Sequence, residues 1–442
     1  MTHQPPDLPE SSGHSGPMAP PTPPIDPDPG WWQRQLPPSP LARRLSVQSI
    51  LFAVGEGTFI TGSAVFFTQI VGLSAAQVGV GLTVAGLVSF FLAVPAGKLA
   101  DRVGTKRIWA ISAGITAALY LLWPFIDGFI AYLAMMIVLE AVSVAGWNGR
   151  GAYTLDIFSK EERVESQAFM RAALNIGFTI GALIGGAALA TNNDDVVRAV
   201  PVVTAALLAL NTFWITRLPE PPAKEPTHDD DQLIKPGALK NRAFLGLMTA
   251  DGVLGTNQVL LNIVIPLWLV EETDAPRVLL AFLFGTNTVM AVLLQVAAAR
   301  GVDSVARSLR ASYISAFFFV LSCGIVLVTH DTLGWVTILL VWVGHVTVTG
   351  AELFQSAGSW GYQSELTDPD QRAEYQGAAH IGHTAGSVWA PALFTWLAME
   401  HGTTGWLVIA AIVLVATTTM RTTSRSAERY LERTTMSTGG LR

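Results

Sequence analysis

The amino-acid sequence predicts an all-α membrane protein whose twelve transmembrane helices form two pseudo-symmetric six-helix bundles. Its composition is the first reason, because 50% of the 442 residues are hydrophobic and only 14% are charged. Typical soluble domains carry about 25% charged residues, and the mean hydropathy of this chain is +0.43. The second reason is that the charges gather in clusters separated by apolar runs of roughly 20 residues, enough to cross a hydrocarbon core of about 30 Å. The third is a sequence similarity between the two halves of the chain.

Twelve apolar runs are long enough to cross the membrane. We expect them at residues 45–70, 76–97, 107–126, 129–153, 166–190, 196–217, 242–270, 278–299, 309–329, 333–358, 374–398 and 403–421. An even number of crossings places both termini on one side, and only Arg198 and Arg277 of the 27 Lys and Arg residues then lie on the other side. Because basic loops stay on the cytosolic side, the sequence predicts a plasma-membrane protein with both termini in the cytosol.

The segments outside the two bundles differ from them in composition. Residues 1–44 are expected to form a disordered Pro-rich cytosolic tail, because this stretch holds 13 of the 25 prolines. The residues that resemble an interfacial anchor before the first helix are Trp31, Trp32, Arg34, Arg43 and Arg44. The stretch 218–241 predicts a cytosolic linker between an N-terminal bundle at 45–217 and a C-terminal bundle at 242–421. Residues 422–442 are expected to be a cytosolic tail.

The two halves are related by nearly constant offsets in sequence. The pairs that align at a shift of 209 residues are Tyr153 and Tyr362, Asp156 and Glu365, Arg163 and Arg372, Glu165 and Glu374, Gln167 and Gln376, and Gly177 and Gly386. At a shift of 195 residues, Glu56 and Gly57 in the first helix correspond to Asp251 and Gly252 in the seventh. A duplicated six-helix unit with a central cavity between the two copies explains both offsets.

Several function classes lack support in the sequence. The single cysteine, Cys323, excludes an intramolecular disulfide and a multi-cysteine metal site. No basic patch interleaved with aromatic residues supports nucleic-acid binding. No cluster of metal ligands or nucleophiles supports an enzyme, and we expect no cofactor. The expected partners are a small-molecule substrate, protons and the lipid bilayer, and we expect the chain to act as a monomer.

A charged, glycine-containing stretch from Gly97 to Arg107 lies between the second and third apolar runs. Its sequence, GKLADRVGTKR, resembles motif A of the major facilitator superfamily, which is written roughly G-x-L-A-D-R-x-G-R-K-R. The residues expected to form a gating loop here are Gly97, Asp101, Arg102, Gly104, Lys106 and Arg107. Gly97 and Gly104 would let two helix ends approach, while Asp101 could attract the N-terminus of a neighbouring helix. The alternative is an ordinary basic cytosolic loop without a gating role.

Acidic residues inside apolar runs suggest a function or a specific partner, because inserting an ionised side chain at the bilayer centre costs about 2.5–3.5 kcal/mol. Glu56 lies twelve residues after Arg44, which is about 18 Å along a helix and close to the membrane midplane. Asp251 and Glu140 lie at similar depths in the seventh and fourth helices. A carboxyl group in low dielectric can take up and release protons near neutral pH. The family resemblance implies that Glu56 and Asp251 face the substrate path; otherwise each acid is a silent structural group.

Other polar residues inside the helices have less defined roles. Asn257 and Asn148 are candidates for the substrate cavity. His380 and His383 share one helix face at i and i+3, so they could bind a metal, sense pH or pack against a neighbouring helix. Glu352 lies nearer the cytosolic end of the tenth helix, where it could face the cavity, although we expect a gate or a structural ion pair.

The fifth helix carries small residues at a spacing that suits close helix packing. The glycines are Gly177, Gly181, Gly185 and Gly186. This run resembles motif C of the same superfamily, which is associated with proton-coupled exporters and usually reads G-x-x-x-G-P-x-x-G-G. Ala182 replaces its proline, and Pro391 occupies the equivalent place in the other half.

A cytosolic ion-pair cluster is expected between the bundles. Its predicted members are Arg150, Asp156, Arg163, Glu365 and Arg372. Arg150 is also the nearest candidate for the arginine of motif B in this family, although it lies toward the cytosolic end of the fourth helix. Such clusters can hold one conformation closed until substrate or protonation shifts the balance.

Together these features predict a secondary active transporter that exports a small organic compound, lipophilic or cationic, by proton antiport with alternating access. The scarcity of intramembrane arginines argues against a dedicated organic-anion substrate. A facilitator-type importer or uniporter of a small solute is the nearest alternative. A membrane-embedded lipid enzyme and a non-transporting receptor are the remote alternatives.

Overall fold

Long apolar helices make up most of the chain. The computed structural model describes residues 36–222 and 236–439. The expected anchor residues Trp31, Trp32 and Arg34, most of the Pro-rich tail and the middle of the linker lie outside these ranges. In the described part of the chain, eleven helical spans are long and apolar enough to cross a membrane. The chain is therefore a multi-pass membrane protein.

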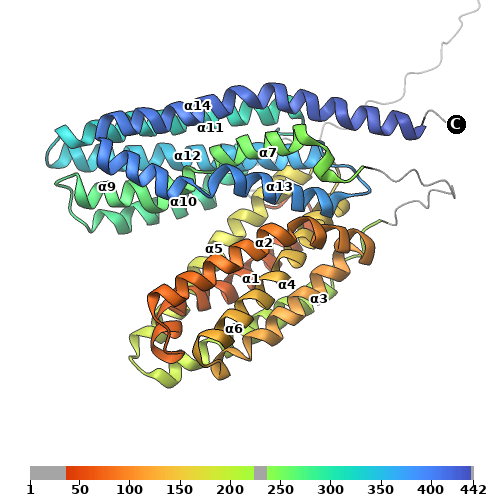
Figure 1. Cartoon of the computed structure of the whole chain (residues 1–442), viewed down its shortest axis with the longest axis horizontal. Helices are drawn as coiled ribbons and strands as arrows, with labels where there is room; N and C mark the ends of the chain where they lie inside the picture. Colours follow the sequence, from red (N-terminus) through yellow and green to blue (C-terminus); the bar gives the residue numbers. More distant parts are fainter. Residues whose placement is uncertain (1–35, 223–235, 440–442) are drawn as a thin grey trace, which may run out of the picture. The chain divides into compact units, whose positions relative to one another are not determined.

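Six crossings form the N-terminal half, which Figure 1 shows in red to yellow-green. They are α1 (Pro40–Val65) with its π-helical extension η2 (Phe66–Ile70), α2 (Ala75–Val103), α3 (Thr105–Tyr120) with η3 (Trp123–Phe125), α4 (Gly128–Ile157), α5 (Arg163–Ala190) and α6 (Asp194–Thr216). Ser39 caps α1 through the amide of Ala42, and Ser74 forms a capping box with Gln77 at the start of α2. These caps satisfy first-turn amides, which explains where the helices begin.

Six further crossings form the C-terminal half. They are α7 (Arg242–Leu254), which continues as α8 (Asn257–Val259), η5 (Leu260–Val264) and α9 (Ile265–Glu271), then α10 (Leu279–Ala299), α11 (Val305–Leu327) with η6 (Val328–Asp331), α12 (Trp335–Glu365), and α13 (Arg372–Ser387) with α14 (Ala390–Gly439). A short turn, η4 (Ala238–Lys240), precedes α7. The last span runs from Arg372 to Thr434, and its backbone breaks at Gly402, where φ is 48°. This span therefore holds two crossings, and the predicted twelve-helix fold is confirmed.

Several helices extend past their predicted ends. α2 continues through Asp101 to Val103 and α3 begins at Thr105, so the predicted gating loop is reduced to a single residue, Gly104. Gly104 has a φ of 108°, which glycine adopts without steric penalty. α14 likewise continues beyond residue 421 to Gly439, where a tail was expected. Hydropathy indicates where the membrane ends, whereas a helix ends only where other partners replace its hydrogen bonds.

Glycines of α5 pack directly on the backbone of α1. The glycines at which an added methyl group would collide with α1 backbone atoms are Gly177, Gly181 and Gly185. Gly186, which was expected to belong to the same packing stripe, faces open space. Residues four apart share a helix face, whereas the next residue along the chain points about 100° away. The stripe therefore consists of three glycines rather than four.

Candidate functional site

A cavity of about 240 Å³ lies inside the N-terminal half, among α1, α3, α4, α5 and α6. Most of its wall is aromatic or aliphatic, and its aromatic side chains are Phe52, Trp109, Trp147 and Phe178. Two polar side chains of α1, at different heights along the helix, also line the cavity. Gln48 precedes Glu56 by two helical turns, or about 12 Å, and both side chains line the cavity. Such a wall suits a small amphipathic molecule.

Glu56 reaches this cavity from a tightly packed part of α1. The neighbouring Gly57 lies against the backbone of Phe178, and the carbonyl of Gly55 accepts a hydrogen bond from Thr204 on α6. The hydroxyl of Tyr120 donates to the Glu56 carboxylate at 3.3 and 3.4 Å. This donor on α3 partly replaces the water that the carboxylate loses on burial.

Arg150 lines the same cavity instead of joining the predicted cytosolic cluster, which corrects the expectation for this residue. Its guanidinium donates to the hydroxyl of Ser49 at 2.9 Å and lies 5.2 Å from the centre of the Trp147 ring. The buried Nε has no hydrogen-bond partner among the described residues. The cavity therefore holds one carboxylate and one guanidinium, and both retain capacity to bind a ligand.

Two other predicted cavity residues have different surroundings. Asn148 is buried and donates to the carbonyl of Ala93 at 2.6 Å, which fixes α4 to α2. Glu140 lies on α4 with its carboxyl group within hydrogen-bonding reach of Ser89 on α2. Neither side chain lines the cavity. The sequence indicated their depth in the membrane, but the packing of α4 on α2 turned both away from the cavity.

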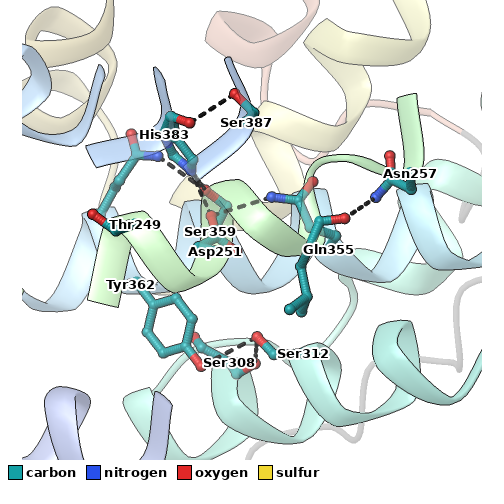
Figure 2. A network of polar contacts seen from close by, with 12 residues as sticks. Thr249, Asp251, Asn257, Ser308, Ser312, Gln355, Ser359, Tyr362, His383 and Ser387 are labelled. Atoms are coloured by element: carbon teal, nitrogen blue, oxygen red, sulfur yellow. Dashed lines mark hydrogen bonds and ion pairs between the residues drawn. The ribbon is translucent and has the colours of Figure 1, made fainter. Parts of the chain in front are cut away.

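Asp251 lies in a separate polar network of the C-terminal half, shown in Figure 2. Its side chain is fully buried. The Oδ2 atom is 2.6 Å from Nε2 of His383 on α13 and accepts a hydrogen bond of 3.1 Å from Gln355 on α12. Ser359 lies 3.3 Å from the same His383 nitrogen. Asp251 therefore does not share the cavity of Glu56, which corrects the expected shared path.

Asn257 is also packed rather than cavity-lining. Its side chain is fully buried and donates to the carbonyl of Leu254 at 2.9 Å. This bond lies at the interruption between α7 and α8, where Gly255 and Thr256 leave the regular helix. Asn257 thus stabilises a break in the seventh crossing directly after Asp251.

The two halves meet at the end of the bundle that contains Asp101. Both carboxylate oxygens of Asp101 accept backbone amides at the start of α13, from Ala373 at 3.0 Å and Glu374 at 2.9 Å. A carboxylate at a helix N-terminus also interacts favourably with the helix dipole. Gly97 packs on the backbone of Ala373, where a Cβ atom would collide. The motif A helix is thereby attached to the other half.

This contact continues along α2 and α13 as a seam of three pairs. The pairs are Gly97 with Ala373, Ala93 with Gly377, and Ser89 with His380. The first two are close backbone contacts, and the third is a hydrogen bond of 3.1 Å. We call these three pairs the α2–α13 seam.

Of the other charged residues of motif A, Lys98 lies 3.7 Å from Glu374 of α13, whereas three lie at the surface or bind within the N-terminal half. Lys106 forms an ion pair of 2.8 Å with Glu220, just beyond α6. Arg102 and Arg107 are exposed. Lys106 thus fixes the start of α3 to the segment after α6, whereas Asp101 and Lys98 contact the other half.

Four of the five predicted cluster residues do lie together at the Asp101 end. Arg372 of α13 pairs with Asp156 of α4 at 2.5 Å and donates to the carbonyl of Leu155. Arg163 lies within electrostatic reach of this pair and of Glu365. Lys160 pairs with Glu365 at 2.7 Å.

A further ion pair joins α5 to α12 away from this cluster. Arg171 approaches Glu352 at 3.8 Å, and Asn287 donates to the same carboxylate at 3.0 Å. Glu352 is buried. The sequence predicted a gate or structural pair for Glu352 but did not name Arg171 as its partner.

Sequence reasoning missed several residues of the cavity and network. Gln48 donates to Asn211 at 2.9 Å across α1 and α6, and its Oε1 atom has no partner among the described residues. Gln48, Phe52 and Glu56 follow one another at four-residue spacing, which would have indicated one helix face. No comparable signal was present for Tyr120 or Arg150, because their partners lie on other helices.

Among the described residues, no group of three or more His, Cys, Asp or Glu side chains is placed to hold a metal ion. His380 and His383 instead contact Ser89 and Asp251 on two different helices. Their arrangement favours hydrogen bonding over metal coordination.

Comparisons with known proteins agree with this architecture. Residues 45–358 match the family model described as Major Facilitator Superfamily. The structure of the transporter FucP in the outward conformation matches with a TM-score of 0.68 at 15% identity, covering 86% of this chain and 98% of that chain. A bacterial homologue of the iron transporter ferroportin, in its outward-facing state, matches at 0.68 and 13% identity, covering 87% and 99%. The human organic anion transporter TETRAN matches at 0.56 and 14% identity, covering 86% and 98%. No curated protein sequence matches the chain.

Proposed function

Because the chain belongs to the Major Facilitator Superfamily, it transports a small solute, and we propose that it exports a lipophilic or cationic organic compound in exchange for protons. The observation that carries this proposal is the position of Glu56 in a cavity whose wall includes four aromatic side chains. One carboxylate can bind either a cationic group or a proton, so the two ligands compete for it. Such competition would make the exchange of substrate for proton obligatory.

The closed Asp101 end supports alternating access. We propose that this end faces the cytosol and that the termini lie on the same side of the plasma membrane, with the chain acting as a monomer. The hydrogen bonds of Asp101 and the Arg372–Asp156 pair would then keep the cytosolic side closed in an outward-facing state. The similar structures of FucP and the ferroportin homologue are described as outward-facing, which agrees with this assignment.

A second candidate function rests on Arg150. Its guanidinium lines the cavity with an unpartnered Nε, so the cavity can also hold a carboxylate or another acceptor group. The sequence alone argued against an organic anion because this arginine was placed outside the cavity. Transport of an organic anion would use Arg150 as its main contact, and Glu56 would then serve the proton alone.

Transport in everted membrane vesicles tests the first candidate. With the vesicle interior acidified, we expect the wild-type protein to accumulate ethidium, a lipophilic cation. Glu56→Gln should reduce this uptake at least about tenfold, since the amide neither carries charge nor exchanges a proton. Glu161→Gln, an exposed acid in the turn before α5, is the matched control and should transport normally.

The same vesicles separate the alternatives. Uptake of benzoate that is lost in Arg150→Gln and kept in the exposed control Arg310→Gln would favour the organic-anion candidate. Accumulation only in right-side-out vesicles would show an importer. Absence of proton-driven uptake in the wild type, or full coupling in both Glu56→Gln and Asp251→Asn, would contradict the antiport proposal.

A further inference from the structure

A chain of polar side chains crosses from the C-terminal half to the N-terminal half near mid-membrane. It begins at Asp251 on α7, continues through His383 and His380 on α13, and reaches Ser89 on α2 and Glu140 on α4. Figure 2 shows its first part, where the His383 imidazole points toward the Asp251 carboxylate. The chain therefore connects an acid in each half through the α2–α13 seam.

The contact between Asp251 and His383 has the length of a charge-assisted hydrogen bond, 2.6 Å. A buried carboxylate with few donors is costly unless a positive charge or a proton compensates it. Oδ2 receives bonds from His383 and Gln355, but Oδ1 has no partner among the described residues. A proton shared with His383 would compensate the charge of Asp251 in its packed position.

His383 connects this carboxylate to the accessible surface. Its side chain is 29% exposed, whereas the Asp251 side chain is 0% exposed. A proton that reaches Asp251 in this conformation must therefore come through its neighbours, and His383 is the titratable neighbour that is partly exposed.

The contact with the N-terminal half is made by His380, which lies one turn from His383 on α13. His380 and His383 are at i and i+3, so a charge on His383 acts directly on His380. His380 Nε2 is 3.1 Å from the hydroxyl of Ser89, which is the one side-chain hydrogen bond of the α2–α13 seam as defined above. A neutral His380 accepts this hydroxyl proton, whereas a doubly protonated imidazole cannot.

The titratable groups around this chain come from every helix packed on α13. α7 contributes Asp251, α12 contributes Tyr362, and α4 contributes Glu140 through Ser89. α2 contributes Lys98 and Asp101, which contact the α13 N-terminus near Glu374, almost two turns from His380. Asp251 is thus the only acid among these groups that contacts His383 directly in the described structure.

We infer that Asp251 and His383 form a proton-binding site of the C-terminal half, separate from the Glu56 cavity, and that the Ser89–His380 bond transmits its occupancy to the N-terminal half. A bound proton stabilises the conformation in which α13 seals Asp251 against α7 and the Asp101 end is closed. Loss of the proton leaves an uncompensated buried carboxylate and favours opening, which admits water. The inference deepens the proposed proton exchange and rests on its alternating access, but it does not depend on the substrate.

The experiment measures the separation of the halves in the full-length protein. Spin labels are attached at Ser159→Cys and Pro369→Cys, two exposed positions at the Asp101 end, in a Cys323→Ala background in lipid nanodiscs. Double electron–electron resonance then gives the fraction with a short distance, which is the closed state. We expect the closed-to-open ratio to rise as pH falls, by at most about tenfold per pH unit for one linked proton.

Variants show whether the pair carries this dependence. Asp251→Asn combined with His383→Gln keeps hydrogen-bonding groups but removes both titrating ones, so the ratio should no longer change with pH. His345→Gln replaces another buried intramembrane histidine and should keep the wild-type response. Ser89→Ala should make the closed fraction less dependent on pH. If the Ser89–His380 bond were purely structural, the substitution would instead lower the closed fraction equally at every pH.

Three outcomes overturn the inference. They are a wild-type distance distribution that does not change between about pH 5 and pH 8, a wild-type response in the double variant, and a lost response in His345→Gln. A pH response without any proton-driven transport in vesicles would count against the proposed function alone, so the two failures are distinguishable.

Discussion

At the scale of single residues, each buried charge in this protein has its own kind of compensation. Glu56 receives a phenol hydroxyl, Asp251 an imidazole and an amide, and Asp156 a guanidinium. Arg150 is held by a serine hydroxyl and an indole ring. A charge paired with its opposite stays fixed, whereas a carboxylate with neutral partners is able to exchange a proton or bind a ligand. Whether the partner of an acid is charged or neutral therefore separates the structural acids from the functional candidates.

The pair of Arg372 and Asp156 should contribute strongly to the closed state. Asp156→Asn leaves the guanidinium of Arg372, only 15% exposed, without a counter-charge. We expect the closed state to lose about 3 kcal/mol relative to the open state, because breaking one side of a buried pair is expensive. The distance between labels at positions 159 and 369 measures this shift.

Glu165→Gln is the control for that substitution. Its partner Arg300 lies 3.4 Å away, and the two side chains are 33% and 36% exposed. A half-exposed pair is worth less than about 1 kcal/mol, so the closed fraction should change little. Equal shifts in both variants would show that the cluster does not hold the halves together.

The sequence indicated how far along each helix a charged residue lies, but not which way its side chain points. Glu56 and Asp251 were located near mid-membrane from the rise of a helix, and Asp101 was expected at a helix N-terminus. Arg150 and Asn148 were misassigned, because the helix face that a residue occupies is set by the helix packed against it. A partner such as Tyr120 or Ala93 is distant in sequence and leaves no local signal.

At the scale of elements, the close contact of α1 and α5 depends on glycine. Gly181 lies against the backbone of α1 at Val54 and Thr58, which cannot move as a flexible side chain does. Such contacts let helices associate in lipid, where no hydrophobic effect drives them together. The sequence identified this stripe from its spacing, but it could not tell that Gly186 lies outside it.

Gly181→Ala should destabilise the N-terminal half. The added methyl group would overlap backbone atoms of α1, and overpacking of this kind costs about 1–3 kcal/mol. We expect a lower thermal unfolding midpoint in detergent, followed by tryptophan fluorescence. Gly186→Ala adds the same methyl group in open space and should leave the midpoint unchanged. Equal midpoints for both variants would contradict the close-packing interpretation.

At the scale of the whole molecule, the α2–α13 seam joins the two halves along three consecutive pairs. The sequence predicted twelve crossings in two halves, because hydropathy and the internal offsets report them directly. It could not predict which helix of one half would meet which helix of the other. That pairing depends on the small residues of two helices, Gly97 and Ala93 on one and Ala373 and Gly377 on the other.

Gly97→Val should force this end open. Its branched side chain would occupy the space of the Ala373 carbonyl in the other half, so the closed-to-open ratio should fall at least about tenfold, or about 1.4 kcal/mol. Gly86→Val is the control on the same helix, since nothing lies within 4 Å of an added Cβ there. The labels at 159 and 369 report the change, and a closed distance retained in Gly97→Val would contradict the role of the seam.

The π-helical turns η2 and η5 occupy matching places in the first and seventh crossings, at Phe66–Ile70 and Leu260–Val264. Each follows the acid of its own half by about the same length of helix. A turn that contains an extra residue interrupts the regular ladder and gives the remaining segment a joint. In the seventh crossing α9 continues beyond η5, so this segment can bend over a bound solute while α7 stays still, whereas η2 is the last turn of the first crossing. Closing the site over a bound solute from the side of the π-helical turns would then require local bending. Release of the solute at the Asp101 end would require separation of the two halves.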